Sequence, residues 1–201
     1  MGMRPAFVFS LLLVSGTAPL DLSWAAPPVK PPSATSAPIP KEVVSEDKLF
    51  AQLRKAESAE EAHGIEQKLQ AMFRASGSPS VDLLLMRAQA AQAATDNKTA
   101  KQLIEAVTNI APGYAEGWHI RSTMEQSAGD DTAALVSLQK VILLNPRHFT
   151  ALTELADKLE EYGDKAGALK LYRRALDLDP QLEEASRKVR ELTQSVEGRD
   201  I

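Results

Sequence analysis

Apolar residues recur at intervals of three to four positions along most of the chain beyond residue 80, and short polar stretches interrupt them regularly. This spacing is typical of amphipathic helices that bury one face. The pattern predicts six helices arranged as three antiparallel pairs. Their expected ranges are 81–94 with 98–110, 115–128 with 131–144, and 149–162 with 165–178.

Three residue types repeat at a fixed distance of 34 residues through this region. Asp ahead of a helix accepts hydrogen bonds from its free N–H groups, Pro after a helix cannot continue it, and Ala lets two helices approach closely. Gly129 and Gly163 come one residue before their Asp, where a left-handed turn often ends a helix. The repeating sets are Pro112, Pro146 and Pro180; Asp96, Asp130 and Asp164; and Ala100, Ala134 and Ala168.

This repeat resembles the tetratricopeptide repeat (TPR) family, whose period is 34 residues. The resemblance implies an all-α, TPR-like helical solenoid of antiparallel helix hairpins, with three repeats at 81–114, 115–148 and 149–182. Two features depart from the family: Ala or Ser replaces its glycine, and Ala91, Glu125 and Leu159 replace its usual tyrosine. The matching positions are Leu84, Trp118 and Leu152 (bulky); Ala88, Ser122 and Ala156 (small); and, in the second helices, Ile104, Leu138 and Tyr172, then Val107, Val141 and Ala175, besides the repeated alanines.

The segments on either side of the repeats are also predicted to be helical. Residues 183–196 form a C-terminal capping helix, because one apolar stripe runs along an otherwise charged segment. Residues 45–78 form a degenerate N-terminal helix pair, in which Ser58 and Glu61 make a capping box for the second helix. We expect this pair to act as an N-terminal cap of the stack. The C-terminal stripe consists of Leu182, Ala185, Val189, Leu192 and Val196.

The first 44 residues differ from the rest in composition. Residues 1–25 have the three parts of a secretory signal peptide: Arg4, an apolar run, and a small-x-small site that ends at Ala25. An uncleaved membrane anchor is the alternative, although the apolar run is short for a membrane span. Residues 26–44 hold six prolines and are predicted to be a disordered linker, either a semi-rigid spacer or a lead-in without a role. The chain is therefore expected to be exported, with the periplasm as its destination and no stable membrane insertion after cleavage.

Composition and charge exclude several classes of function. The net charge of −4 and the isoelectric point near 5.5 argue against a nucleic-acid partner, which needs Lys and Arg against its phosphates. With no cysteine, the chain has no disulfide and no thiolate metal site. Neither phosphate-binding glycine loops nor the nucleophile and zinc motifs of hydrolases occur in it.

Three histidines are the remaining candidates for metal chemistry. Glu116 and His119 form an E-x-x-H pair, which is half of the motif found in helical di-iron sites. The second copy and the additional glutamates are absent, and His63 and His148 have no acidic partners at a suitable spacing. The sequence therefore predicts no metal site, no cofactor and no catalytic residue.

In the resembling family the first helix of each repeat lines a concave groove, which implies that a protein or peptide binds there. Acidic residues gather at the C-terminal end of this groove and favour a basic partner, although they could simply solvate a helix face near Lys158. The family's carboxylate-binding Lys, Arg and Asn residues are missing from these positions. The groove residues predicted to contact a partner are Gln89, Glu116, His119, Thr123, Gln126, Thr153, Asp157, Glu160 and Glu161.

Two classes of function remain open. The first is a non-enzymatic protein–protein interaction scaffold or adaptor of the cell envelope, because solenoids offer an extended concave surface. The second is an envelope enzyme, or a regulatory subunit of one, that works through groove carboxylates such as Glu116 with Asp157.

Replacement of Trp118 tests the stacking of the repeats. We expect Trp118→Ala to lower the free energy of unfolding by about 3–5 kcal/mol, because it removes a large apolar side chain from the interface between helices. Chemical denaturation followed by circular dichroism measures the change. Unchanged stability would count against stacked hairpins.

Overall fold

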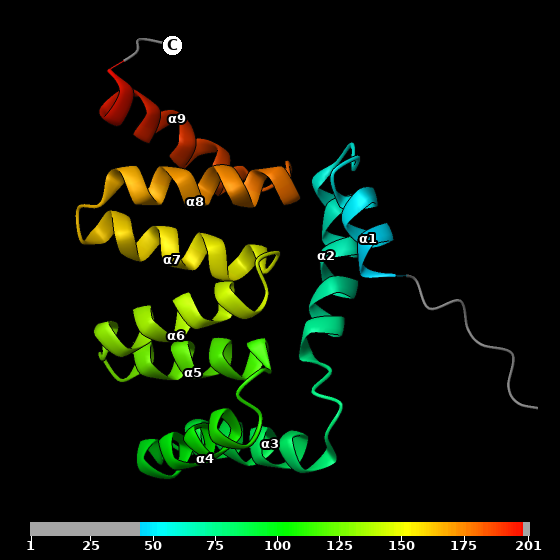
Figure 1. Cartoon of the computed structure of the whole chain (residues 1–201), viewed down its shortest axis with the longest axis vertical. Coiled ribbons are helices and arrows are strands. Elements are labelled where there is room, and N and C mark those ends of the chain that lie inside the picture. The colour runs from blue at the N-terminus through cyan, green and yellow to red at the C-terminus, as the bar shows by residue number, and fades with distance from the viewer. Residues whose placement is uncertain (1–44, 199–201) are drawn as a thin grey trace, which may run out of the picture. The chain divides into compact units, whose positions relative to one another are not determined.

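A computed structural model describes residues 45–198. Every secondary-structure element in this part of the chain is an α-helix, which confirms the predicted fold class (Figure 1). The signal peptide and the linker predicted for residues 1–44 lie outside the described residues. The helices are α1 (Glu46–Leu53), α2 (Ala59–Arg74), α3 (Pro79–Ala93), α4 (Asn97–Ile110), α5 (Ala115–Ser127), α6 (Asp131–Leu144), α7 (Phe149–Glu161), α8 (Lys165–Leu178) and α9 (Glu183–Glu197).

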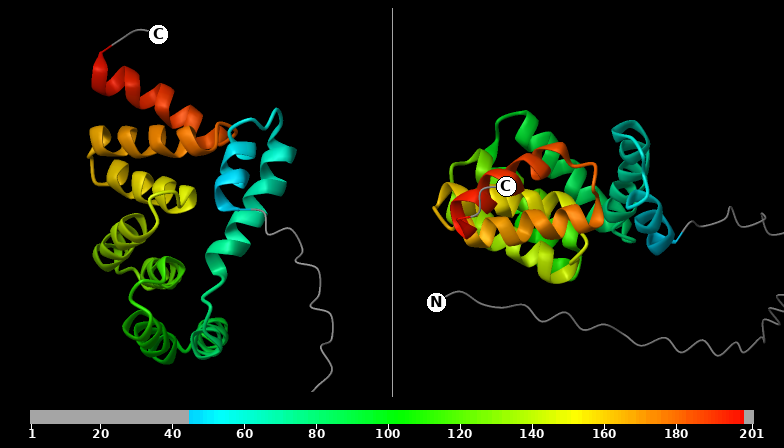
Figure 2. Two further views of the ribbon diagram at one scale, coloured as in Figure 1. Left: turned by 45° about the vertical axis from the view of Figure 1, so that its right-hand side comes forward. Right: turned by 90° about the horizontal axis from the view of Figure 1, so that it is seen from above.

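Helices α3 to α8 form three hairpins that stack in sequence order, and α9 packs on the last of them (Figures 1 and 2). Their bounds differ from the predicted ranges by two residues at most. None of the helices between residues 45 and 198 is both long enough and apolar enough to cross a membrane.

The helix ends follow the predicted capping pattern. Each repeated Asp accepts a hydrogen bond from the backbone N–H three residues later, at 2.9–3.1 Å. Gly129 and Gly163 adopt left-handed backbone conformations, with φ of 76° and 86°. Thr95 occupies the equivalent position of the first hairpin with φ of 60°, a conformation that is rare for a β-branched residue.

Small residues allow the helices to cross closely, as predicted. The repeated alanines and the small positions of the first helices are exposed by 3% or less. Gly117 marks another close approach, because a Cβ atom there would lie 3.1 Å from the Val107 side chain of α4. Trp118 packs against the cluster around Leu138 and donates its indole N–H to the Pro112 carbonyl at 3.0 Å. Since Trp118 is only half-buried, the cost of its removal falls near the lower end of the expected range, about 3 kcal/mol.

The C-terminal helix α9 closes its end of the stack. Ala185 and Leu192 are buried against the cluster around Tyr172, and Leu182 and Val189 pack beside them. Lys188 also reaches Glu160 of α7, with an Nζ–Oε2 distance of 2.9 Å. The outer side of α9 carries charged residues that solvate this end.

The N-terminal helix pair differs from the expectation of a cap stacked on α3–α4. Helices α1 and α2 instead run along the edge of the stack where the turns between the hairpins lie (Figure 1). The sequence offers a physical reason, because Glu66 and Gln70 stand 34 residues before the buried Ala100 and Ile104. A repeat built on α2 would have to bury a carboxylate and an amide at these positions, which is unfavourable without partners.

The α1–α2 pair contacts three turns: the two that join successive hairpins, α4–α5 and α6–α7, and the one that joins the last hairpin to α9. At the first turn, Tyr114 donates its hydroxyl to the Arg74 carbonyl at 2.8 Å. At the second, Arg147 bridges Glu46 and Asp47 at 2.7 and 2.5 Å. At the third, the Gln181 amide donates to the Ala56 carbonyl at 2.8 Å, while burial and the neighbouring Glu66 raise the pKa of Asp179 to about 7.

An aromatic contact anchors the middle of this edge. The ring of Phe73, from α2, stacks on His148 with a centroid distance of 5.0 Å and lies 6.4 Å from Phe149. Phe149 is buried in the same cluster as Leu49, Phe50 and Leu53 of α1. The core of the α1–α2 pair is therefore continuous with the stack.

Replacement of Phe73 tests whether this contact holds the pair in place. We expect Phe73→Ala to lower the free energy of unfolding by about 2 kcal/mol, because the ring loses its burial against His148 and Phe149. Hydrogen exchange should accelerate in α1 and α2 and change little in α7 and α8. The control is Met72→Ala, whose side chain is exposed; equal effects of the two changes would contradict the assigned packing.

Candidate functional site

The first helices of the second and third hairpins, α5 and α7, are joined by a chain of alternating carboxylates and imidazoles. The Glu116 Oε2 atom lies 3.0 Å from Nε2 of His148 and 3.5 Å from Nδ1 of His119. The other ring nitrogen of His119, Nε2, lies 3.0 Å from Oε2 of Glu154. Two residues predicted as groove residues, Glu116 and His119, are thus brought together with two that were not.

The cluster is largely withdrawn from solvent, which strengthens its electrostatics. The side chains of Glu116 and His119 are 12% and 16% exposed. Burial opposes the charged form of Glu116, but hydrogen bonds from both histidines outweigh it and lower the pKa of Glu116 to about 2. Burial likewise opposes charge on His119, but the bonds to Glu116 and Glu154 raise its pKa to about 9. His119 is therefore a cation held between two carboxylates at neutral pH.

His148 is the N-cap of helix α7, and this role determines the tautomer of its ring. Its Nδ1 atom accepts the backbone N–H of Ala151 at 3.2 Å, as an N-cap does. A neutral His148 therefore carries its proton on Nε2, the atom that faces Glu116. The ring is 3% exposed, so this arrangement is enclosed by protein.

Glu116, His119 and His148 are also the residues most suited to holding a metal ion in the described part of the chain, since their ligand atoms lie within 4.8 Å of one another. A metal would need an unprotonated Nε2 on His148. That atom donates to Glu116 while Nδ1 serves as the helix cap, so metal binding would require the cap to be lost. The geometry fits an internally satisfied ion-pair network better than a metal centre.

A row of rings connects this cluster to the N-terminal helix pair. The rings of His119 and His148 have centroids 4.7 Å apart, and Phe73 stacks on the far side of His148. His119 on α5 is therefore connected to α2 through the side chains of His148 and Phe73.

The predicted acidic residues of α7 each have a partner within the protein. Asp157 accepts the hydroxyl of the buried Tyr172, and burial followed by this contact raises the pKa of that tyrosine. Glu160 binds Lys188, and Glu161 binds Lys158 at 3.0 Å. These carboxylates therefore stabilise the packing of α7, α8 and α9 as well as facing solvent.

A pocket of about 270 Å³ opens between α7 and the start of α9. Thr153 and Asp157 line it from α7, with Glu183 and Glu184 from α9. No lysine or arginine is among its lining residues in the described chain. Its negative charge suits a cationic side chain.

The remaining predicted residues are more scattered. Thr123 is exposed and donates its hydroxyl to the His119 carbonyl, while Thr153 donates to Thr150. Gln126 is half-buried, and Gln89 is exposed on α3. Of the predicted residues, the structure brings Glu116 and His119 into one cluster, whereas the acidic residues of α7 have other partners and Gln89 lies on a separate helix.

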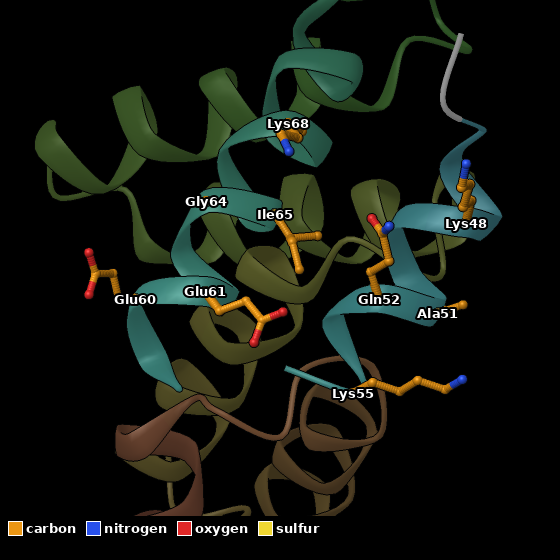
Figure 3. Close-up of a pocket in the computed structure, with 9 residues that line it drawn as sticks. All are labelled: Lys48, Ala51, Gln52, Lys55, Glu60, Glu61, Gly64, Ile65 and Lys68. Carbon is orange, nitrogen blue, oxygen red and sulfur yellow. The ribbon is translucent and has the colours of Figure 1, made fainter. Parts of the chain in front are cut away.

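A larger and more open cavity of about 590 Å³ lies between α1 and α2 (Figure 3). It combines Lys55 and Lys68 with Glu60 and Glu61, around Ile65. None of the groove residues predicted from the sequence lines it. Its mixed charges favour no particular ligand class.

Sequence reasoning missed the roles of His148 and Glu154. The position of His148 just before a helix indicates a capping residue and nothing more. Glu154 follows His119 by 35 residues. In a 34-residue repeat this spacing places two side chains one position apart on neighbouring first helices. That register is the signal that could have found the pair.

Comparison with known proteins supports the repeat assignment. A TPR repeat-containing protein of Rhizobium etli is 29% identical to this chain over 152 residues, which cover 76% of this chain and 74% of that protein. The chain resembles tetratricopeptide repeat proteins in sequence and in fold. No protein-family model matches it.

Solved structures of TPR proteins share the fold. The TPR domain of Sgt2 from Aspergillus fumigatus superimposes with a TM-score of 0.51 at 19% identity, over 60% of this chain and 81% of that one. MamA does so with a TM-score of 0.52 at 17% identity, over 66% and 83%. The first TPR of Spaghetti (RPAP3), bound to an HSP90 peptide, gives 0.52 at 16%, over 58% and 93%. At these identities the likeness shows the fold alone.

The stabilising effect of the cluster should depend on pH in a defined way. The contribution of Glu116 is present above its ordinary pKa of 4.5 and is lost as the pH falls toward 2. The contribution of His119 is present below its ordinary pKa of 6.5 and is lost as the pH rises through about 9. Both are present between about pH 4.5 and 6.5.

We therefore expect His119→Gln to lower the free energy of unfolding most near pH 5.5, on the order of 2–3 kcal/mol, and less at pH 9.5. Urea denaturation at both pH values measures the difference from the wild type. His63→Gln is the matched control. Contrary to the expectation from the sequence, His63 lies 3.6 Å from Glu66, but its side chain is 68% exposed and such a pair contributes little. A loss that does not vary with pH would argue against a charged His119.

Proposed function

We propose that this chain is an exported, non-enzymatic scaffold of the cell envelope that binds a protein or peptide along the face formed by α5 and α7. The observation that carries the proposal is the alignment of α5 with α7, joined by His119 and Glu154 at 3.0 Å. This contact links the two helices directly. A fixed, concave array of helices suits the capture of an extended segment. The export of the chain rests on the predicted signal peptide at residues 1–25.

The partner we propose is a segment with a basic side chain. The structure of Spaghetti (RPAP3) contains the HSP90 peptide SRMEEVD, in which acidic residues predominate. The pocket between α7 and α9 has the opposite preference, because Asp157, Glu183 and Glu184 line it; Glu184 has Arg187 as an ion-pair partner outside the lining, whereas Glu183 has none among residues 45–198. A lysine or arginine side chain would complete this charge distribution.

The geometry gives less support to an enzyme. A pair of working carboxylates would need Glu116 and Asp157 to face the same substrate, but Glu116 binds two histidines and Asp157 binds Tyr172. A carboxyl with a pKa of about 2 is also unsuited to donate a proton near neutral pH. The scaffold is therefore the function that we propose.

Binding of defined peptides tests the charge preference. We expect an arginine-containing nonapeptide labelled with fluorescein to bind more tightly than its glutamate counterpart, and more weakly at 300 mM than at 50 mM salt. Glu183→Lys should weaken binding about twofold to fivefold, as loss of a rim charge pair does, with little change in stability. Glu60→Lys, on α2, is the control for charge alone. Equal binding of both peptides would contradict a basic partner.

Site-specific photo-crosslinking then tests the location. A benzophenone amino acid at Thr153 should crosslink the bound arginine peptide, whereas the same probe at Lys68 on α2 should not. Crosslinking from Lys68 alone would place the binding surface on the α1–α2 pair instead.

A further inference from the structure

A second, more apolar pocket of about 280 Å³ lies at the junction of α4 and α5. Ala100 and Ile104 of α4 and Met124 of α5 form its apolar part. Asn97 and Asp130 also line it, so it opens at the α3–α4 and α5–α6 turns, on the edge opposite α1 and α2 (Figure 1). It is therefore separate from the face proposed above for a basic partner.

The repeat register explains why this pocket is empty of side chains. Leu159 of the third hairpin packs against the cluster that contains Leu138 and Leu155. The residue 34 positions earlier is Glu125, whose carboxylate is drawn away to Arg121 and Ser137, at 2.7 and 2.6 Å. The space between the last two hairpins is thus filled by Leu159. The equivalent space between the first two hairpins has no apolar side chain at that position, because Glu125 stands there.

The chain itself carries a side chain suited to this pocket. Tyr162 follows α7 and is 58% exposed, although its counterparts in the other hairpins are Ala94 and Ala128. A cavity of about 150 Å³ can hold a benzene ring, so 280 Å³ has room for a tyrosine ring. The polar rim offers partners for the hydroxyl, as buried tyrosines require.

Charges on the two elements are complementary. Glu161 and Asp164 lie on either side of Tyr162. The pocket is bordered by Lys98 and Lys101, both exposed and without an ion pair among residues 45–198. Three acidic residues also line the pocket: Glu125 is bound to Arg121, Asp130 caps α6, and Glu105 has no ion pair among residues 45–198.

The position of the two elements allows a closed assembly. Tyr162 lies at the turn between α7 and α8, on the same edge as the pocket opening (Figure 1). Two copies facing each other across a two-fold axis can therefore satisfy both sites at once, which is the condition for a closed dimer. We propose that two copies of this chain associate edge to edge, each inserting Tyr162 into the α4–α5 pocket of the other.

The oligomeric state of the full chain tests this directly. Sedimentation velocity from 1 to 100 µM should show a dimer whose dissociation constant rises at least tenfold in Tyr162→Ala and rises with salt. The control is Leu143→Ala, which removes another exposed apolar side chain. Leu143 lies at the C-terminal end of α6, away from the α5–α6 turn where the pocket opens, so its removal should leave the dimer unchanged. The proposal would be overturned if the wild type were monomeric at 100 µM, even if the pocket bound another ligand. It would also be overturned if Tyr162→Ala dimerised as strongly as the wild type.

Two further variants separate pocket insertion from a loss of folding. Glu125→Leu with Ser137→Leu installs the residues found at 159 and 171, and should fill the pocket, preserve or raise the melting temperature, and abolish the dimer. Lys98→Glu with Lys101→Glu, and separately Glu161→Lys, should each weaken self-association. An equimolar mixture of the two charge variants should dimerise again, because both contacts regain opposite charges. Failure of the mixture to recover would reject the proposed pairing.

Discussion

The close crossing of paired helices at small residues is the constraint on which the rest of this structure depends. Six positions hold only Ala or Ser and are almost completely buried, so the helices approach to a distance that larger side chains would prevent. Hairpins of equal length then stack in a single register. That register brings His119 of one repeat to Glu154 of the next. The positions are Ala88, Ser122, Ala156, Ala100, Ala134 and Ala168.

Much of the stack could be predicted because its signals are local and occur three times. The aspartate caps, the prolines after the helices and the glycines of the turns each act within a few residues, and a 34-residue period places them in every unit. The acidic residues of α7 were also found, but their partners were not. Tyr172 and Lys188 bind Asp157 and Glu160 from other helices, and such contacts depend on packing that no local pattern encodes.

The arrangement of α1 and α2 could not be read from the sequence, because it rests on contacts that occur once and join distant residues. Arg147 and Asp47 are 100 positions apart, and Gln181 and Ala56 are 125 apart. The unsuitable Glu66 could have excluded a stacked repeat, but nothing nearby indicates which edge the pair would choose instead. His148 shows the same difficulty, since one side chain caps α7, binds Glu116 and stacks on Phe73.

The separation of α1 and α2 from their partners has a consequence for the order of folding. Contacts between successive hairpins join residues that are near in sequence, and such contacts form early. Helices α1 and α2 are synthesised before the repeats, yet the surface they cover includes Gln181 and exists only once the last turn has been made. The pair is therefore synthesised before the repeats but docks after them, and its docking indicates that all three repeats are complete.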